Sequence, residues 1–325
     1  MSPPLSRRAA LALPLLAGPA RAQPGWPERG LTMLHGFPPG GGADVVARLV
    51  AQPLGEQLGR PVVVEGRPGA GGNIGSGVLA RSPADGYTIG LQTGSHAVNA
   101  AFGRVQGYDP VDGFAWITIL VRYAFVLVVR ADHPAQDLAA LLAMARRGPG
   151  AVQFGSGGVG SSHHLTGEYL NAAAGVQMTH VPYRGDAAGL TAVLSGELPV
   201  MISTTVGALG LLAGEARLRP LAVTSTRRSA RLPQVPTVAE AALPGFASYT
   251  WAGLAAPAGT PPAVVARLHQ ATAQGLAEPA LRQRLEGMVD GELVLNSPAE
   301  ARDLMAADLE KWRRLIRERQ ISAEG

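Results

Sequence analysis

Short apolar runs alternate with longer amphipathic ones from residue 30 onward. The runs "LTMLHGF", "PVVVEGR" and "YTIGLQT" have the length and β-branched content of buried strands, and helical patterns such as "ADVVARLVAQPLGEQLG" separate them. This order predicts strand, loop, helix, strand, short helix and strand. Strands that alternate with helices favour an α/β fold with a largely parallel sheet.

A second α/β unit is predicted from residue 125, where "FVLVVR" is apolar on both faces. The helix "DLAALLAMARR", the strand "VQF" and the loop "GSGGVGSS" repeat the order of the first unit, and an amphipathic helix closes the chain. A chain of 325 residues has room for two such lobes. We predict one lobe from residues 23–124 plus 250–325 and the other from 125–249. A two-stranded hinge near Tyr123 and Thr250 would let them close on a ligand in the cleft.

Residues 1–22 have the pattern of a signal peptide. Arg7 and Arg8 precede an apolar run that is too short to span a membrane, and a small-residue cleavage site follows at residues 20–22. "SRRAAL" also fits a twin-arginine signal, so the general and twin-arginine export routes both stay open. We therefore expect an exported, periplasmic protein.

Charge and cysteine content exclude several classes of function. Loss of the leader removes three arginines and lowers the formal charge from +4 to about +1, and no basic run is interleaved with aromatic residues. A nucleic-acid partner is therefore not expected. The absence of cysteine excludes disulfides, thiolate metal sites, a cysteine nucleophile and a lipidated cysteine anchor.

The stretch "FPPGGGADVVARL" at residues 37–49 is the first candidate site. Its prolines stiffen the exit from the strand, and its three glycines leave backbone amides uncovered at the start of a helix. A helix start of this kind favours an anion by about 0.3–1 kcal/mol when exposed and by up to about 2 kcal/mol when partly buried. Asp44 could cap its own helix or receive a ligand amine. The candidate ligand-binding residues of this loop are Phe37, Pro39, Gly40, Gly41, Ala43 and Asp44.

The second glycine-rich loop matches GxGxxG at residues 155–160. A dinucleotide site is not favoured, because the next strand ends in "THVPYRG" without the acidic residue that binds the ribose. A phosphate-binding P-loop is excluded because no GK[ST] follows any glycine run, so no cofactor is expected. Ser156, Ser161 and Ser162 could donate to a ligand at this strand end, or one of them could cap the helix while the others are solvated.

His163 and His164 point about 100° apart on a helix and cannot chelate one metal together, and no HExxH motif occurs. We expect no metal. His163 could donate to a ligand carboxylate or simply pack. In "VPYRGD", Arg184 could pair with a ligand carboxylate or with a nearby acid such as Asp186, and Tyr183 could form a pocket wall. A serine hydrolase is disfavoured because the chain has no GxSxG elbow.

Motifs along nearly the whole mature chain resemble the periplasmic solute-binding proteins of tripartite tricarboxylate transporters, also called the Bug family. They include "GFPPGGGADVVARL", "GRPVVVEGRPGAGGNIG", "ADGYTIGLQTGSHAVNAAF", "FGSGGVGSSHHLTGEYL" and "LAVTSTRRSARLPQVPTVAEAALPGF". The resemblance implies a periplasmic binding protein-like II fold, in which two lobes close on a small carboxylate. It also implies a protein that performs no chemistry and delivers its ligand to membrane permease subunits, and we expect that protein to be a monomer. A periplasmic sensor that presents the ligand to a membrane signalling partner is the main alternative.

The resemblance also implies which residues bind the ligand. The loop from Phe37 to Asp44 holds one carboxylate, and the turn at Thr93, Gly94 and Ser95 contributes from the same lobe. From the facing lobe come Ser156, Gly157, Ser161 and His163, with Tyr183 nearby. We keep His96, Ser162 and Arg184 as further candidate ligand-binding residues beside these.

One departure from the family pattern concerns residues 203 and 204. Many members have an aspartate followed by asparagine where this chain has Ser203 and Thr204 in "VMISTTVG". Both residues are kept in the candidate site. We expect the missing negative charge to disfavour an amino-acid ligand and to allow a dicarboxylate, an aromatic acid or a neutral tail.

Overall fold

The first lobe is built on three parallel strands. The computed structural model describes residues 25–105, 107–214 and 217–321, so the predicted signal peptide lies outside the described residues. Strand β1 (Leu31–His35) lies between β2 (Val62–Gly66) and β3 (Thr88–Thr93). The helical segments of this lobe are α1 (Gly42–Leu58), η1 (Ala70–Gly72), α2 (Asn73–Ala80), α3 (Gly94–Ala101) and α9 (Pro262–Gly275).

The second lobe repeats this construction. Strand β5 (Gln153–Ser156) pairs in parallel with both β6 (Thr179–Pro182) and β7 (Val200–Thr204). Strand β8 (Leu218–Val223) completes the lobe. Its helices are α4 (Leu138–Ala145), α5 (Ser162–Ala174), α6 (Asp186–Ser195), α7 (Thr205–Gly214) and α8 (Val238–Ala241).

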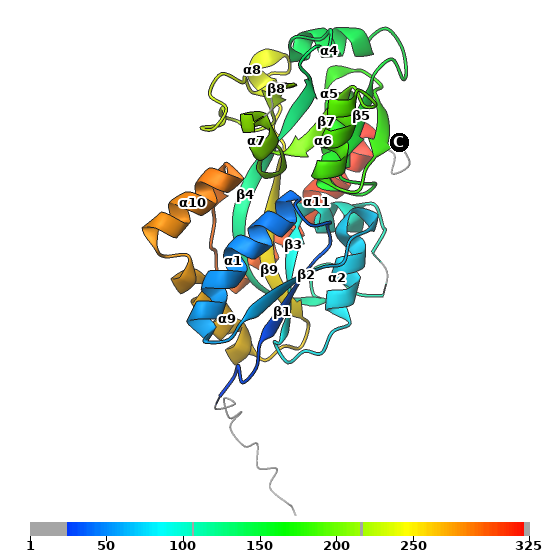
Figure 1. Cartoon of the computed structure of the whole chain (residues 1–325). Helices are drawn as coiled ribbons and strands as arrows, with labels where there is room; N and C mark the ends of the chain where they lie inside the picture. Colours follow the sequence, from blue (N-terminus) through cyan, green and yellow to red (C-terminus); the bar gives the residue numbers. More distant parts are fainter. Residues whose placement is uncertain (1–24, 106, 215–216, 322–325) are drawn as a thin grey trace, which may run out of the picture.

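Strand β4 (Phe114–Arg130) belongs to both lobes, and Figure 1 shows it running from the half that holds α1 and α9 to the half that holds α4 and α8. It pairs antiparallel with β9 (Tyr249–Pro257) up to Ala124 and with β7 from Phe125 onward. Strand β10 (Gly291–Leu293) also pairs with β4. Two further helices are α10 (Pro279–Val289) and α11 (Pro298–Arg319).

The predicted α/β fold with two lobes is confirmed, whereas the sheet is parallel only in its outer strands. Strands β4 and β9 pair antiparallel with their neighbours at its centre. Prediction had recognised only the end of β4 at residues 125–130, and had not identified α3, α10 or β10. No helix in the described part of the chain has both the length and the apolar character needed to cross a bilayer.

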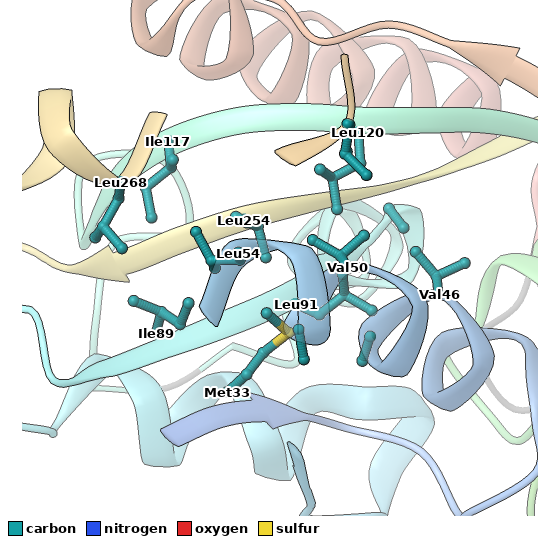
Figure 2. Packing of buried hydrophobic residues seen from close by; sticks show 14 of the residues in the cluster. Met33, Val46, Val50, Leu54, Ile89, Leu91, Ile117, Leu120, Leu254 and Leu268 are labelled. Atoms are coloured by element: carbon teal, nitrogen blue, oxygen red, sulfur yellow. The ribbon is translucent and has the colours of Figure 1, made fainter. Parts of the chain in front are cut away.

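The position of α1 is fixed by one apolar face of the helix. Val46, Val50 and Leu54 are spaced four residues apart, so they share a face and are fully buried on the sheet. Figure 2 shows them packed among Met33, Ile89, Leu91 and Leu254. Each such side chain contributes about 1.5–3 kcal/mol through burial. This packing holds the first turn of α1 at the carboxyl end of β1.

Two buried histidines, His96 and His164, and the half-buried His180 make stability depend on pH. His96 Nε2 lies 2.8 Å from the Pro110 carbonyl, and the His164 and His180 rings stack with centroids 4.0 Å apart. Burial lowers the pKa of His96 and of His180 to about 4. Burial, together with the nearby His180, lowers the pKa of His164 to about 3. All three rings are therefore neutral in the folded protein at pH 7.

We expect the free energy of unfolding to fall as the pH drops from 6.5 toward 4. The folded-state pKa values lie below the unfolded value of 6.5, so the unfolded chain binds more protons in this range. Each histidine contributes a slope of up to about 1.4 kcal/mol per pH unit. In denaturant titrations, His180→Asn should flatten this slope. An equal slope in His180→Asn and the wild type would contradict the assignment.

Candidate functional site

A cavity with an empty volume of about 440 Å³ lies between the two lobes. The first lobe supplies the loop after β1 and the turn after β3. The second lobe supplies the start of α6, the end of β7 and His163 of α5, and β4 and β9 supply one residue each. Its lining residues are Phe37, Pro38, Pro39, Gly41, Gly42, Ala43, Thr93, Ser95, Tyr123, His163, Arg184, Gly185, Asp186, Ala187, Thr204 and Thr250. Both lobes therefore face one shared cavity.

Three helices begin at this cavity without a capping side chain. The N-cap residues are Gly41 for α1, Thr93 for α3 and Gly185 for α6. None of them has a side chain that accepts a hydrogen bond from the first amides of its helix. The first amides of a helix have no partner within it. Helix α5 differs, because the side chain of Ser161 caps it by accepting from the His164 amide. The three uncapped starts give the cavity donors and a positive potential suited to an anion.

Glycine is required where the lobes approach each other. A Cβ at Gly42 would lie 2.6 Å from Val206 Cγ1 and 2.9 Å from Thr204 Oγ1 of the second lobe. A Cβ at Gly71 would lie 2.7 Å from the Val159 carbonyl oxygen and 2.8 Å from the Ser161 nitrogen, again across the lobes. Real side chains do not fit at such distances, so these glycines allow the lobes to meet.

Hydroxyl groups bridge the lobes behind the cavity. The Ser162 amide donates to Ser95 Oγ at 3.0 Å, and the two serine oxygens lie 3.2 Å apart. Thr250 Oγ1 of β9 donates to Ser162 Oγ at 3.3 Å. Ser162 thus holds Ser95 at the cavity wall instead of lining the cavity itself.

Asp186 is a buried carboxylate in the cavity wall. Its Oδ1 accepts from Ser203 Oγ at 2.6 Å, from the Thr204 amide at 3.0 Å and from His163 Nε2 at 3.1 Å. Its Oδ2 accepts from Thr204 Oγ1 at 2.8 Å. Burial acts to raise the pKa of Asp186, but His163 and the two hydroxyls outweigh it and lower the pKa. The carboxylate is therefore ionised at neutral pH.

The expectation that no negative charge lies beside Ser203 and Thr204 is wrong, because Asp186 places a carboxylate against both residues. Sequence reasoning saw Asp186 only as a helix start or a surface partner of Arg184. The contact joins the start of α6 to the end of β7, and pairing between distant segments is not visible in the local pattern.

Tyr123 and Thr250 are cavity residues that sequence analysis had placed only at the hinge. They are paired in register across β4 and β9, so both side chains reach the cavity together. Tyr123 is buried, and its hydroxyl has no hydrogen-bond partner among the described residues. Burial raises the pKa of Tyr123, and the charge of Asp186 raises it further. The hydroxyl therefore remains a neutral donor available to a ligand.

The structure places nine of the predicted residues in the cavity wall: Phe37, Pro39, Gly41, Ala43, Thr93, Ser95, His163, Arg184 and Thr204. Asp44 lies outside it and serves its own helix. Its Oδ2 accepts from the Gly40 amide at 3.0 Å and from Arg48 Nε at 3.0 Å, and His35 Nε2 lies 3.2 Å from its Oδ1. Asp44 therefore neither caps α1 nor faces the cavity, and its carboxylate instead ties the glycine loop to the first turn of the helix.

The remaining predicted residues lie behind or beside the cavity. His96 faces the core, where its ring stacks on Tyr108. Ser156 Oγ lies 2.6 Å from His180 Nε2 and is fully buried. Gly157 and Tyr183 line a neighbouring groove. A Cβ at Gly94 would meet Thr250 Oγ1 at 2.7 Å, Ser161 caps α5, and Ser203 lies behind Asp186.

The second glycine-rich loop therefore does not line the cavity, and the start of α6 takes the place expected for it. The sequence signal for this site is the glycine and aspartate of "YRGDAAGL", at the point where a strand gives way to a helix.

Comparison with known proteins gives a consistent assignment. The model of the tripartite tricarboxylate transporter family receptor (TctC) matches residues 46–321. A UPF0065 protein in the tcbD-tcbE intergenic region of Pseudomonas sp. (strain P51) is 38% identical over 319 residues, which is 97% of this chain and 94% of that protein.

Solved structures agree with this match. R. palustris Rpa4515 with adipate superposes with a TM-score of 0.86 at 33% identity, covering 91% of this chain and 99% of that one. MatC (Rpa3494) from Rhodopseudomonas palustris with bound malate gives a TM-score of 0.84 at 27% identity, covering 90% and 100%. The chain therefore belongs to the tripartite tricarboxylate transporter receptor family, whose motifs its sequence resembles.

Proposed function

We propose that this protein is an exported, periplasmic solute-binding protein. It captures a small organic carboxylate between its lobes and delivers it to the membrane permease of a tripartite tricarboxylate transporter. The observation that carries the proposal is the convergence of three uncapped helix starts on one cavity between the lobes. Two relatives of similar fold were solved with adipate and with malate, both carboxylates.

The energetics of such a site are sufficient for capture by closure. A ligand that moves the lobes from 1:99 open to 99:1 closed must bind the closed form better by about 5.5 kcal/mol. Hydrogen bonds to a charged group contribute about 1.5–3 kcal/mol each. Amides at the starts of α1 and α3, with the hydroxyls of Ser95 and Tyr123, provide enough donors for one carboxylate.

A hydrolase is not supported by the cavity. Ser95 Oγ is paired with Ser162 rather than with a histidine, and the partly buried Ser156–His180 pair lies outside the cavity.

The function is tested by a thermal-shift screen of the mature protein against mono-, di- and tricarboxylates and aromatic acids, with sugars and amines as controls. Ligand at one hundred times its Kd stabilises the folded state by about 2.7 kcal/mol, which raises Tm measurably. We expect at least one carboxylate, and neither control class, to raise Tm. Mass spectrometry of the protein as purified should identify a copurified carboxylate. Stabilisation by the sugars or amines alone would contradict the proposal.

Gly41→Glu should abolish carboxylate binding without unfolding the protein. Gly41 has an ordinary φ of −80°, and a Cβ there would only touch the Pro38 carbonyl oxygen at 3.6 Å. The new carboxylate would occupy the start of α1 that we assign to the ligand. Isothermal titration should show a loss of about a hundredfold or more. Gly41→Gln adds similar bulk without charge and should lose less, and unchanged affinity in Gly41→Glu would contradict the assignment.

Tyr123→Phe should weaken binding without lowering Tm. Its hydroxyl has no partner to lose among the residues that the structure describes, whereas a hydrogen bond to a ligand carboxylate is worth about 1.5–3 kcal/mol, or roughly 10- to 150-fold in Kd. Tyr108→Phe is the matched control. Tyr108 Oη donates to Asn73 Oδ1 at 2.9 Å away from the cavity, so its loss should lower Tm and leave Kd unchanged. The opposite pattern would exclude the Tyr123 hydroxyl as a ligand donor.

A further inference from the structure

The cavity of a carboxylate-binding protein here contains a carboxylate of its own. Asp186 Oδ1 accepts from three donors, whereas Oδ2 accepts only one hydrogen bond from the described residues, that of Thr204 Oγ1. A carboxylate oxygen has lone pairs for two donors. Oδ2 therefore retains acceptor capacity, and Asp186 is one of the residues that line the cavity.

This carboxylate lies close to the start of α1. A Cβ built on Gly42, the first residue of the helix, would lie 3.7 Å from Asp186 Oδ2. The amides that we assign to the ligand carboxylate and the free acceptor on Asp186 are thus within reach of one small molecule. Two groups that lie close together on the ligand can therefore use both.

The pairing of charges decides which ligands fit. A carboxylate without a neighbouring donor would bring two negative charges together with nothing between them, and like charges at short range oppose binding. An amino or hydroxyl group on the adjacent carbon would instead donate to Asp186. Ligands that lack this donor would leave the buried acceptor unpaired, which is the strongest basis for discrimination in a polar pocket.

We propose that Asp186 is a specificity-determining residue, which accepts a hydrogen bond from an amino or hydroxyl group beside the ligand carboxylate. The protein then prefers 2-amino and 2-hydroxy acids over unsubstituted carboxylates. The inference rests on the proposed function, because it assumes that a carboxylate occupies the start of α1. It reverses the expectation drawn from Ser203 and Thr204, since the charge missing at those positions is supplied by Asp186.

A purely structural role for Asp186 makes different predictions. Its bonds to Ser203 and Thr204 join the start of α6 to the end of β7, so removal could lower stability alone. A structural residue would change Tm and scale the affinity for every ligand by one factor. A specificity residue changes the ratio of affinities between ligands that differ at one group.

Isothermal titration of matched acids tests the proposal on the wild-type protein. The sets are succinate, malate and aspartate; glutarate, 2-hydroxyglutarate and glutamate; and propionate, lactate and alanine. In at least one set the amino or hydroxy acid should bind tenfold or more tighter than the unsubstituted acid. The hydroxy and amino members show which donor Asp186 accepts. If plain acids bind as tightly as their substituted partners, Asp186 has no such role.

Variants separate the roles of charge and structure. Asp186→Asn keeps the shape of the side chain but removes the charge, and should reduce the preference to within about threefold of unity. The double variant Asp186→Ser with Ser203→Asp exchanges the two partners of the Ser203–Asp186 hydrogen bond, so the carboxylate moves to position 203. It should restore part of the preference. It also provides a test if Asp186→Asn folds poorly. Asp308→Asn removes a mostly buried carboxylate that accepts from Trp251 Nε1 outside the cavity, and should leave the preference unchanged.

The outcomes distinguish this inference from the proposed function. If no carboxylate binds the wild type, the proposed function itself fails, and the inference fails with it. If carboxylates bind but Asp186→Asn keeps the wild-type preference, only the role of Asp186 is overturned.

Discussion

The site depends on the first backbone amides of three helices, for which the described part of the chain provides no capping side chain. A buried donor without a partner costs about 1–3 kcal/mol. Helices α1, α3 and α6 begin at one cavity, and none of them carries a capping side chain. Their acceptor must therefore come from whatever fills the cavity, and an anion fits both the donors and the helix dipoles.

The strand pair β4 and β9 sets the geometry in which these helix starts meet. β4 exchanges its partner β9 for β7 between Ala124 and Phe125, so one strand is part of the core of both lobes. Tyr123 and Thr250, paired on these strands, also line the cavity. The connection between the lobes thus supplies polar groups to the site as well as holding the lobes together.

Sequence patterns predicted those features of the fold that depend on residues close together in the chain. Period-two and helical patterns located β1, β3, α1 and the glycine loop between them, because strand ends and helix starts are encoded within a few residues. They missed the antiparallel pairing of β4 and β9, and with it the exposure of Tyr123 to the cavity, because that depends on segments more than a hundred residues apart. His96 was misplaced for a simpler reason, since its neighbour Ser95 faces the cavity and the next helical residue points about 100° away.

The most direct measurement is a crystal structure of the mature protein with the tightest-binding acid of the matched sets. The account predicts a ligand carboxylate in the cavity, with an oxygen about 3 Å from the amide nitrogen of Gly42 or Ala43. A ligand held instead at residues 155–160, with water at the start of α1, would contradict it.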